Sequence, residues 1–88
     1  MVFVTARHMV GGTYHEHIAS VRWQDPGTAQ TGETQRADMV TWIRGGGQAF
    51  VQSGSLTVAV GVVDANPPYI RTFADGVWTD NLLALPTY

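Results

Sequence analysis

Residues 66–86 read NPPYIRTFADGVWTDNLLALP, the part of the chain with the densest structural signals. Its 21 residues include three prolines, three aromatic residues, one arginine and two aspartates. Residues 69–73 and 77–79 have the composition of strands, and the Ala-Asp-Gly between them is a hairpin turn sequence. After the hairpin, Asp80 and Asn81 can cap a short turn that carries leucines. We expect this segment to be ordered and docked on the domain. Its expected anchors are Tyr69, Ile70, Phe73 and Trp78.

The next strong signal toward the N-terminus is the apolar run LTVAVGVV at residues 56–63. A strand without polar alternation is typical of a central strand that is covered on both faces. Gly61 within it indicates a bulge or a close backbone approach. A Ser-Gly-Ser turn separates this run from a short predicted strand at residues 48–52.

One helix is predicted, over residues 35–44. Thr34 offers an N-cap side chain before it, and the glycines at 45–47 are residues that commonly end a helix. The apolar residues that recur on one face of this helix, and are therefore expected in the core, are Met39, Val40 and Ile43.

The first part of the chain predicts a hairpin, with strands at residues 2–9 and 14–23 joined across a Gly-Gly spacer. The stretch from Asp25 through Gly32 is polar and begins with a turn sequence, so we interpret it as a loop. The element order is then β-β-α-β-β-β-β in a single domain, residues 1–88. This order predicts an α+β fold: a small curved antiparallel sheet or partial barrel with one helix packed on it. It does not predict the order of the strands in the sheet.

Composition narrows the classes of function. Charged residues make up 14% of the chain and hydrophobic residues 44%, against about 25% charged residues in typical domains. A small domain with so little charge leaves apolar surface uncovered, which favours self-association or a bound partner. The five basic residues are scattered arginines and the pI is about 5.8, so the basic stripe of a nucleic-acid-binding protein is not predicted.

Other absences exclude particular chemistries. The chain has no cysteine, which excludes thiolate catalysis and cysteine-based zinc sites. It has neither a secretory signal pattern nor an apolar run near the ~20 residues of a membrane span, so a cytoplasmic protein with no membrane partner is expected.

Tyr69, Arg71, Trp78, Asp80 and Asn81 form the candidate interaction surface. Arginine and aromatic side chains are enriched at interface hot spots, which favours recognition of a partner. The competing interpretation is structural. Arg71 would then pair with Asp80, and Asp80 and Asn81 would tie the segment to the sheet through hydrogen bonds.

Three histidines allow a metal hypothesis. His15 and His17 would share one face of a strand, and His8 could lie beside them across the predicted hairpin, with Glu16 adjacent. Three imidazoles and a carboxylate suit zinc. However, solvated polar residues beside a Gly-Gly turn are also common, and short histidine-rich tracts are often only compositional. No metal ligand is therefore predicted.

The tryptophans Trp23, Trp42 and Trp78 could stack on nucleobases or a sugar, but tryptophans in small domains are also core or interface anchors. No serine or threonine is paired with a histidine in a recognised catalytic motif. The chain is therefore expected not to be an enzyme, with no catalytic residue and no cofactor.

Several motifs together resemble a bacterial family of short proteins that is catalogued only as a domain of unknown function. They are V-R-W at residues 21–23, the arginine-led helix before glycine at 36–45, Y-I-R-T at 69–72, D-N-L at 80–82 and L-P at 85–86. The resemblance covers nearly the whole chain. It implies no reaction, substrate, cofactor or functional residue.

The sequence as a whole favours a small non-enzymatic interaction or structural-accessory module, of cellular or phage origin. It would self-associate as a homo-oligomer or join a larger assembly through a protein partner. The alternative is a ligand or nucleic-acid binder that uses the aromatic and arginine residues of the C-terminal hairpin.

Overall fold

Seven strands, one α-helix and one short 3-10 helix make up the computed structural model, which describes all 88 residues. The strands are β1 (Val2–Met9), β2 (Ile18–Gln24), β3 (Thr31–Gln35), β4 (Ala49–Ser53), β5 (Leu56–Val63), β6 (Tyr69–Ala74) and β7 (Val77–Thr79). The helices are η1 (His15–His17) and α1 (Arg36–Arg44). All seven strands belong to one open sheet with the order β3-β2-β1-β4-β5-β6-β7. The predicted α+β class with a curved, unclosed sheet is therefore confirmed.

The sheet is mixed, because one of its strand pairs is parallel. Five neighbouring pairs are antiparallel, as predicted, whereas β1 and β4 run in the same direction through the pairs Val2↔Ala49 and Phe3↔Phe50. The expectation of a wholly antiparallel sheet is wrong at this pair. The chain returns through β2, β3 and α1 before β4 begins, and such a crossover lets two strands lie parallel.

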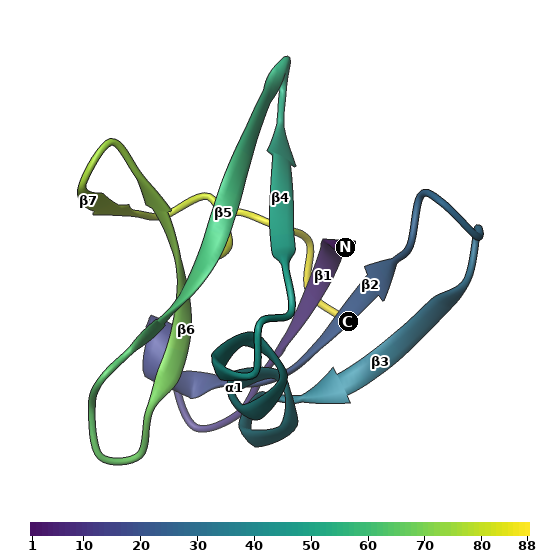
Figure 1. Ribbon diagram of the computed structural model, residues 1–88. Helices are drawn as coiled ribbons and strands as arrows, with labels where there is room; N and C mark the ends of the chain where they lie inside the picture. The colour runs from purple at the N-terminus through teal and green to yellow at the C-terminus, as the bar shows by residue number, and fades with distance from the viewer.

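The core fills the concave side of the sheet, where the helix packs. Figure 1 shows α1 between strands β5 and β6 on one side and strands β2 and β3 on the other. Met39 and Val40 of α1 are buried and Ile43 packs against them, as the periodicity predicted. The strand residues buried with them are Val2, Val4, Ile18, Val21, Ala49, Val51, Val60 and Ile70.

Two segments differ from the sequence-based expectation near the first hairpin. Residues 31–35 form the edge strand β3, which pairs with β2 along its whole length, although the stretch through Gly32 was expected to be loop. Thr34 therefore lies in a strand and does not cap α1, whose N-cap position is Gln35. Residues 15–17 were expected in a strand but form η1, closed by the bond from the His17 N–H to the Tyr14 carbonyl.

Strand β5 is fully buried on one face only. Val58 and Val60 are buried, whereas Thr57 and Ala59 between and beside them are exposed. The apolar run was therefore wrongly interpreted as a strand buried on both faces. Gly61 fits the second of its two predicted roles, because a Cβ there would lie 3.3 Å from the Trp78 ring.

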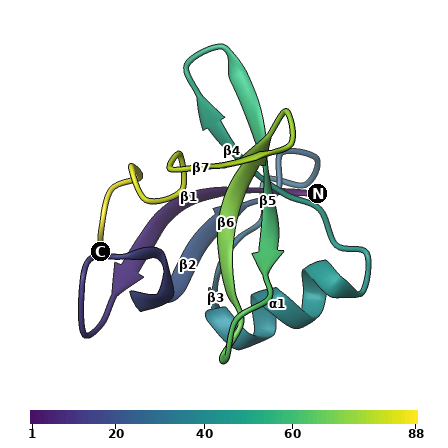
Figure 2. The same ribbon diagram turned by 90° about the vertical axis from the view of Figure 1, so that its left-hand side faces the viewer.

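The segment after β7 crosses back to β1, and Figure 2 shows it in yellow beside that strand. Leu82 is completely buried, and the Arg7 N–H donates to the Pro86 carbonyl at 3.0 Å. Of the four expected anchors, Ile70 is completely buried and Tyr69 is half-buried, but Phe73 and Trp78 remain 40% and 37% exposed. Ile70 and Leu82 therefore anchor this segment. The aromatic rings of Phe73 and Trp78 are left at the surface.

Candidate functional site

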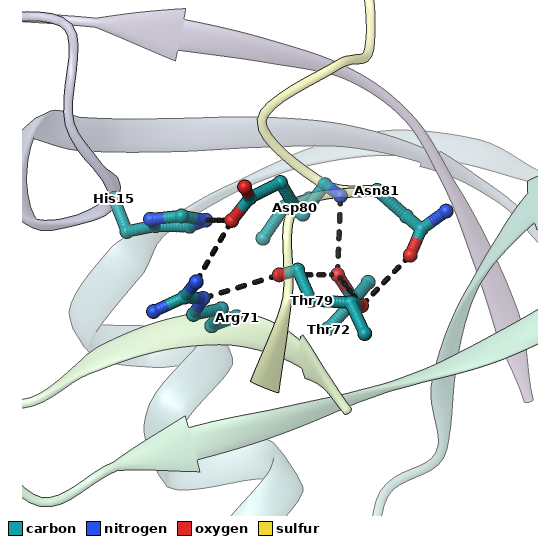
Figure 3. Close-up of polar contacts among 7 residues, drawn as sticks. His15, Arg71, Thr72, Thr79, Asp80 and Asn81 are labelled. Carbon is teal, nitrogen blue, oxygen red and sulfur yellow. Dashed lines mark hydrogen bonds and ion pairs between the residues drawn. The ribbon is translucent and has the colours of Figure 1, made fainter. Parts of the chain in front are cut away.

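The five candidate residues lie on the β6–β7 hairpin and at the start of the segment that follows it. Arg71, Asp80 and Asn81 take part in a polar network at the base of the hairpin (Figure 3). Trp78 contacts Phe73 instead, with ring centroids 5.0 Å apart in an edge-to-face arrangement. Tyr69, at the start of β6, pairs across the sheet with Val63 and contributes no side-chain hydrogen bond to the network. The candidate set thus divides into a polar part and an aromatic part.

An arginine–aspartate pair organises the polar network. The Arg71 Nη2 donates to Asp80 Oδ1 at 2.8 Å, and its Nε donates to the Thr79 carbonyl at 3.1 Å. The Arg71 side chain is 29% exposed, whereas the Asp80 side chain is 72% exposed. The pair therefore has the geometry of the structural tie that the sequence allowed, and it occupies two of the donor groups that a partner would otherwise use.

His15 lies on the other side of the same aspartate. Its Nε2 is 3.4 Å from Asp80 Oδ1 but makes no aligned hydrogen bond, and the residue is only 4% exposed. Burial, and next the charge of Arg71, hold the pKa of His15 below its usual 6.5, although Asp80 acts in the opposite direction. The imidazole is therefore neutral at neutral pH, because burial disfavours its charged form.

Two threonine hydroxyls join the Arg71–Asp80 pair to the segment after β7. The Thr72 hydroxyl, which is fully buried, donates to the Thr79 carbonyl at 3.0 Å and lies 3.4 Å from the Leu82 N–H. The single hydroxyl proton of Thr79 is shared between Thr72 Oγ1 at 2.8 Å and Asn81 Oδ1 at 2.7 Å. These contacts fix the direction in which the chain leaves the hairpin (Figure 3).

The aromatic part of the site extends far beyond the hairpin. Direct cross-strand pairs run Phe3↔Phe50, Phe50↔Ala59, Ala59↔Phe73 and Phe73↔Trp78, from β1 through β4, β5 and β6 to β7. Residues that pair directly across strands share one face of a sheet. We call these five residues the aromatic row, and they lie on the face opposite to the buried Val2, Ala49, Val58, Val60 and Thr72.

The aromatic row is partly exposed and uncharged. Phe73 and Trp78 are 40% and 37% exposed, Ala59 is exposed, and Phe3 and Phe50 are half-buried with ring centroids 6.4 Å apart. Phe3 and Phe50 were not recognised in the sequence as site residues. Only the cross-strand register brings them beside Phe73 and Trp78, and no local pattern encodes that register.

The three histidines do not converge. The Nδ1 of His8 contacts the Tyr88 carbonyl, His15 faces Asp80, and the ring of His17 lies against Gly12. The chain has no group of three or more His, Cys, Asp or Glu side chains placed to hold a metal ion. The strand geometry on which the zinc hypothesis depended is wrong, because residues 15–17 form η1.

The three tryptophans also lie apart. Trp78 belongs to the aromatic row, whereas Trp23 and Trp42 line a cavity between α1 and the first strands, together with Met39. A single stacking surface built from all three rings is therefore not formed.

Comparison with known proteins gives the family. The family model described as "Protein of unknown function (DUF3892)" matches residues 3–86, and the chain belongs to that family. No curated protein and no solved structure was found to match. The one helix, α1, is too short to cross a membrane.

Proposed function

We propose that this chain is a small non-enzymatic interaction module, and that its docking surface is the aromatic row. The observation that carries the proposal is a row of four aromatic rings and one alanine aligned across five strands, in which Ala59, Phe73 and Trp78 are exposed. Phe and Trp side chains bring large contact areas with few rotatable bonds, and both are enriched in protein–protein interfaces.

A second copy of the chain is the proposed occupant. Two identical surfaces can meet across a two-fold axis only if the surface is complementary to itself. The aromatic row contains no charged residue, so facing copies of it bring no like charges together, which supports this pairing. Two sheets that pack face to face lie about 10 Å apart and interdigitate their side chains.

In this proposal, the polar network supports the surface and does not make the contact. Arg71 and Asp80 are bonded to each other and hold β6 to the segment after β7. Trp78 lies over Gly61, where a Cβ would approach the indole to 3.3 Å. Because Gly61 has no side chain, the exposed Trp78 ring can pack directly against β5.

The test is sedimentation velocity over a range of concentrations, with Phe73→Glu beside the matched control Val77→Glu. Val77 is 62% exposed and belongs to the same hairpin, but it pairs with Ala74 and lies outside the aromatic row. We expect the wild type and Val77→Glu to associate, and Phe73→Glu to be monomeric. A wild type that remains monomeric at every concentration would refute self-association. The interaction module as a whole would fail if, in addition, no protein from the source cell were captured by the wild type and lost with Phe73→Glu.

Single-stranded nucleic acid is the second candidate, favoured by one observation. Aromatic rings on an open sheet face are the platform on which bases stack in several RNA-binding modules. The row has no free basic side chain beside it, since Arg71 is paired with Asp80, and the net charge of the chain is −2. Titration of Trp78 fluorescence with oligonucleotides at low salt distinguishes the two. A saturable change would favour nucleic acid, and a flat titration would exclude it.

A further inference from the structure

A second apolar site lies on the concave side of the sheet, away from the aromatic row. It is a cavity of about 280 Å³ lined by five residues, four of them hydrophobic. They are Val2, Trp23, Thr34, Met39 and Trp42. Val2 and Met39 are core residues with 8% and 2% exposure, whereas Trp42 is 40% exposed. The cavity thus joins the core to the surface beside α1.

Two glycines hold the indole rings that form the walls of this cavity. A Cβ on Gly32 would lie 2.5 Å from the Trp23 ring, and a Cβ on Gly47 would lie 2.2 Å from the Trp42 ring. Real Cβ atoms do not approach so closely, so each ring takes a position that only glycine permits. The Trp23 ring is also bonded to Thr34, so this wall is set before any ligand arrives, which lowers the ordering cost of binding.

Thr34 is the one lining residue whose side chain is not predominantly apolar. Its Oγ1 accepts a hydrogen bond from Trp23 Nε1 at 2.9 Å. Because the indole nitrogen is only a donor, this bond uses a lone pair of the hydroxyl and leaves the hydroxyl proton free. The Thr34 hydroxyl therefore offers a hydrogen-bond donor to the cavity.

We propose that this cavity binds a small, uncharged, planar aromatic molecule that carries one hydrogen-bond acceptor. The size fits, because an apolar cavity of about 150 Å³ already holds benzene, so that one or two fused rings suit the larger volume here. An ionised ligand does not suit it, because none of the five lining residues is charged and a buried charge without a partner is costly. The acceptor of the ligand meets the Thr34 hydroxyl.

The test uses the indole N–H signals of the protein in ¹H–¹⁵N spectra, with quinoline as the probe. The three tryptophans give one indole signal each, and single Trp→Phe variants assign them. We expect the signals of Trp23 and Trp42 to move and saturate together as quinoline is added, while the Trp78 signal stays in place. Trp78 is thus an internal control, because it lies in the aromatic row and not in the cavity lining.

The role of the hydroxyl is tested with Thr34→Val and its conservative counterpart Thr34→Ser. Loss of one neutral hydrogen bond weakens binding by about 2- to 12-fold, so Thr34→Val should bind quinoline more weakly by this factor and Thr34→Ser should bind as the wild type does. Naphthalene, which has the same shape but no acceptor, should bind both variants equally. The backbone amide spectrum shows whether each variant keeps the fold.

Three results would overturn the proposal or its acceptor requirement. If no indole signal moves up to the solubility limit of quinoline, the cavity does not take an aromatic ligand. If all three signals move together without saturation, the contact is unspecific and the site is equally excluded. If Thr34→Val keeps the fold and binds quinoline as tightly as the wild type, the acceptor requirement is wrong. None of these results depends on self-association, which the Phe73→Glu variant tests separately.

Discussion

Replacing Thr72 with valine should destabilise the domain, although the two side chains have nearly the same shape. Thr72 is completely buried, and its hydroxyl contacts the Thr79 carbonyl, the Thr79 hydroxyl and the Leu82 N–H. Valine fills the space but cannot make a hydrogen bond, so the exchange is not neutral at a buried site. The network therefore determines the size of the effect.

The loss in the free energy of unfolding depends on which hydrogen-bond partners of Thr72 have no other bond in the variant. The Thr79 carbonyl keeps its bond from Arg71 Nε at 3.1 Å, and the Thr79 hydroxyl keeps Asn81 Oδ1 at 2.7 Å. The Leu82 N–H loses the Thr72 oxygen. One buried donor left without a partner costs about 1–3 kcal/mol. In a domain of this size, each kcal/mol lowers the melting temperature by roughly 4–8 °C, so that a loss near the middle of the range gives about 8–16 °C.

The assay is urea and thermal unfolding followed by circular dichroism, with Thr57→Val as the matched control. Thr57 lies in β5, is exposed, and makes no side-chain hydrogen bond. The same substitution there should change the free energy of unfolding by less than about 0.5 kcal/mol. If Thr72→Val unfolds with a free energy within that margin of the wild type, the hydroxyl network does not hold the hairpin to the following segment.

Three further predictions address other parts of the molecule. Leu82→Ala should lower the free energy of unfolding by about 2–5 kcal/mol, because it empties a fully buried site; an unchanged urea midpoint would contradict the docking of this segment. Gly47→Ala should displace the Trp42 ring, shift its indole N–H signal and lower the free energy of unfolding by about 1–3 kcal/mol through overpacking. An indole signal that does not move would contradict the close approach of the Trp42 ring to Gly47. Since the pKa of His15 is lowered from 6.5 in the folded state, the unfolded chain binds the proton first as the pH falls. Stability should therefore begin to drop as the pH passes through 6.5 and should go on dropping until the pH is below the lowered pKa of the folded state. His15→Gln should flatten that dependence, and an equal slope in wild type and variant would count against it.

Elements with strong local signals could be predicted from the sequence. The helix over residues 36–44 has apolar residues at helical spacing and glycines after it, and the β6–β7 hairpin has a turn sequence between two strand-forming runs. Local chemistry and tertiary structure agree in these segments, so the prediction is confirmed there.

Elements that depend on distant partners could not be predicted in this way. Strand β3 reads TGETQ and has no apolar residue. It forms because its backbone pairs with β2 and because the Trp23 indole lies on Gly32 and bonds to Thr34. In contrast, residues 15–17 alternate as a strand would, but the chain turns there into η1.

The candidate site likewise has one part that the local sequence predicts and another that depends on distant strands. Arg71 and Asp80 are nine residues apart, joined by a short hairpin, so their pairing was one of two interpretations that the sequence allowed. The aromatic row brings together Phe3, Phe50 and Phe73 from strands far apart in the chain. Their alignment follows from strand order and register, and a shift of one residue would move each ring to the opposite face.

The pairing between β1 and β4, which is only two residue pairs long, has a consequence for the order of folding. One arm of the sheet consists of β4, β5, β6 and β7, which are joined by consecutive turns. The other arm consists of β1, β2 and β3, which are also neighbours in the chain. Each arm can form from local contacts, which cost little loop-closure entropy. The strand backbones of the two arms pair at only two positions of β1 and β4, with the whole segment from β2 to α1 between the paired strands, and at the bridge from Arg7 to Thr87. Non-local closure of this kind is the slow step in small proteins. We therefore expect the joining of the arms, which completes the aromatic row between Phe3 and Phe50, to be a late event in folding.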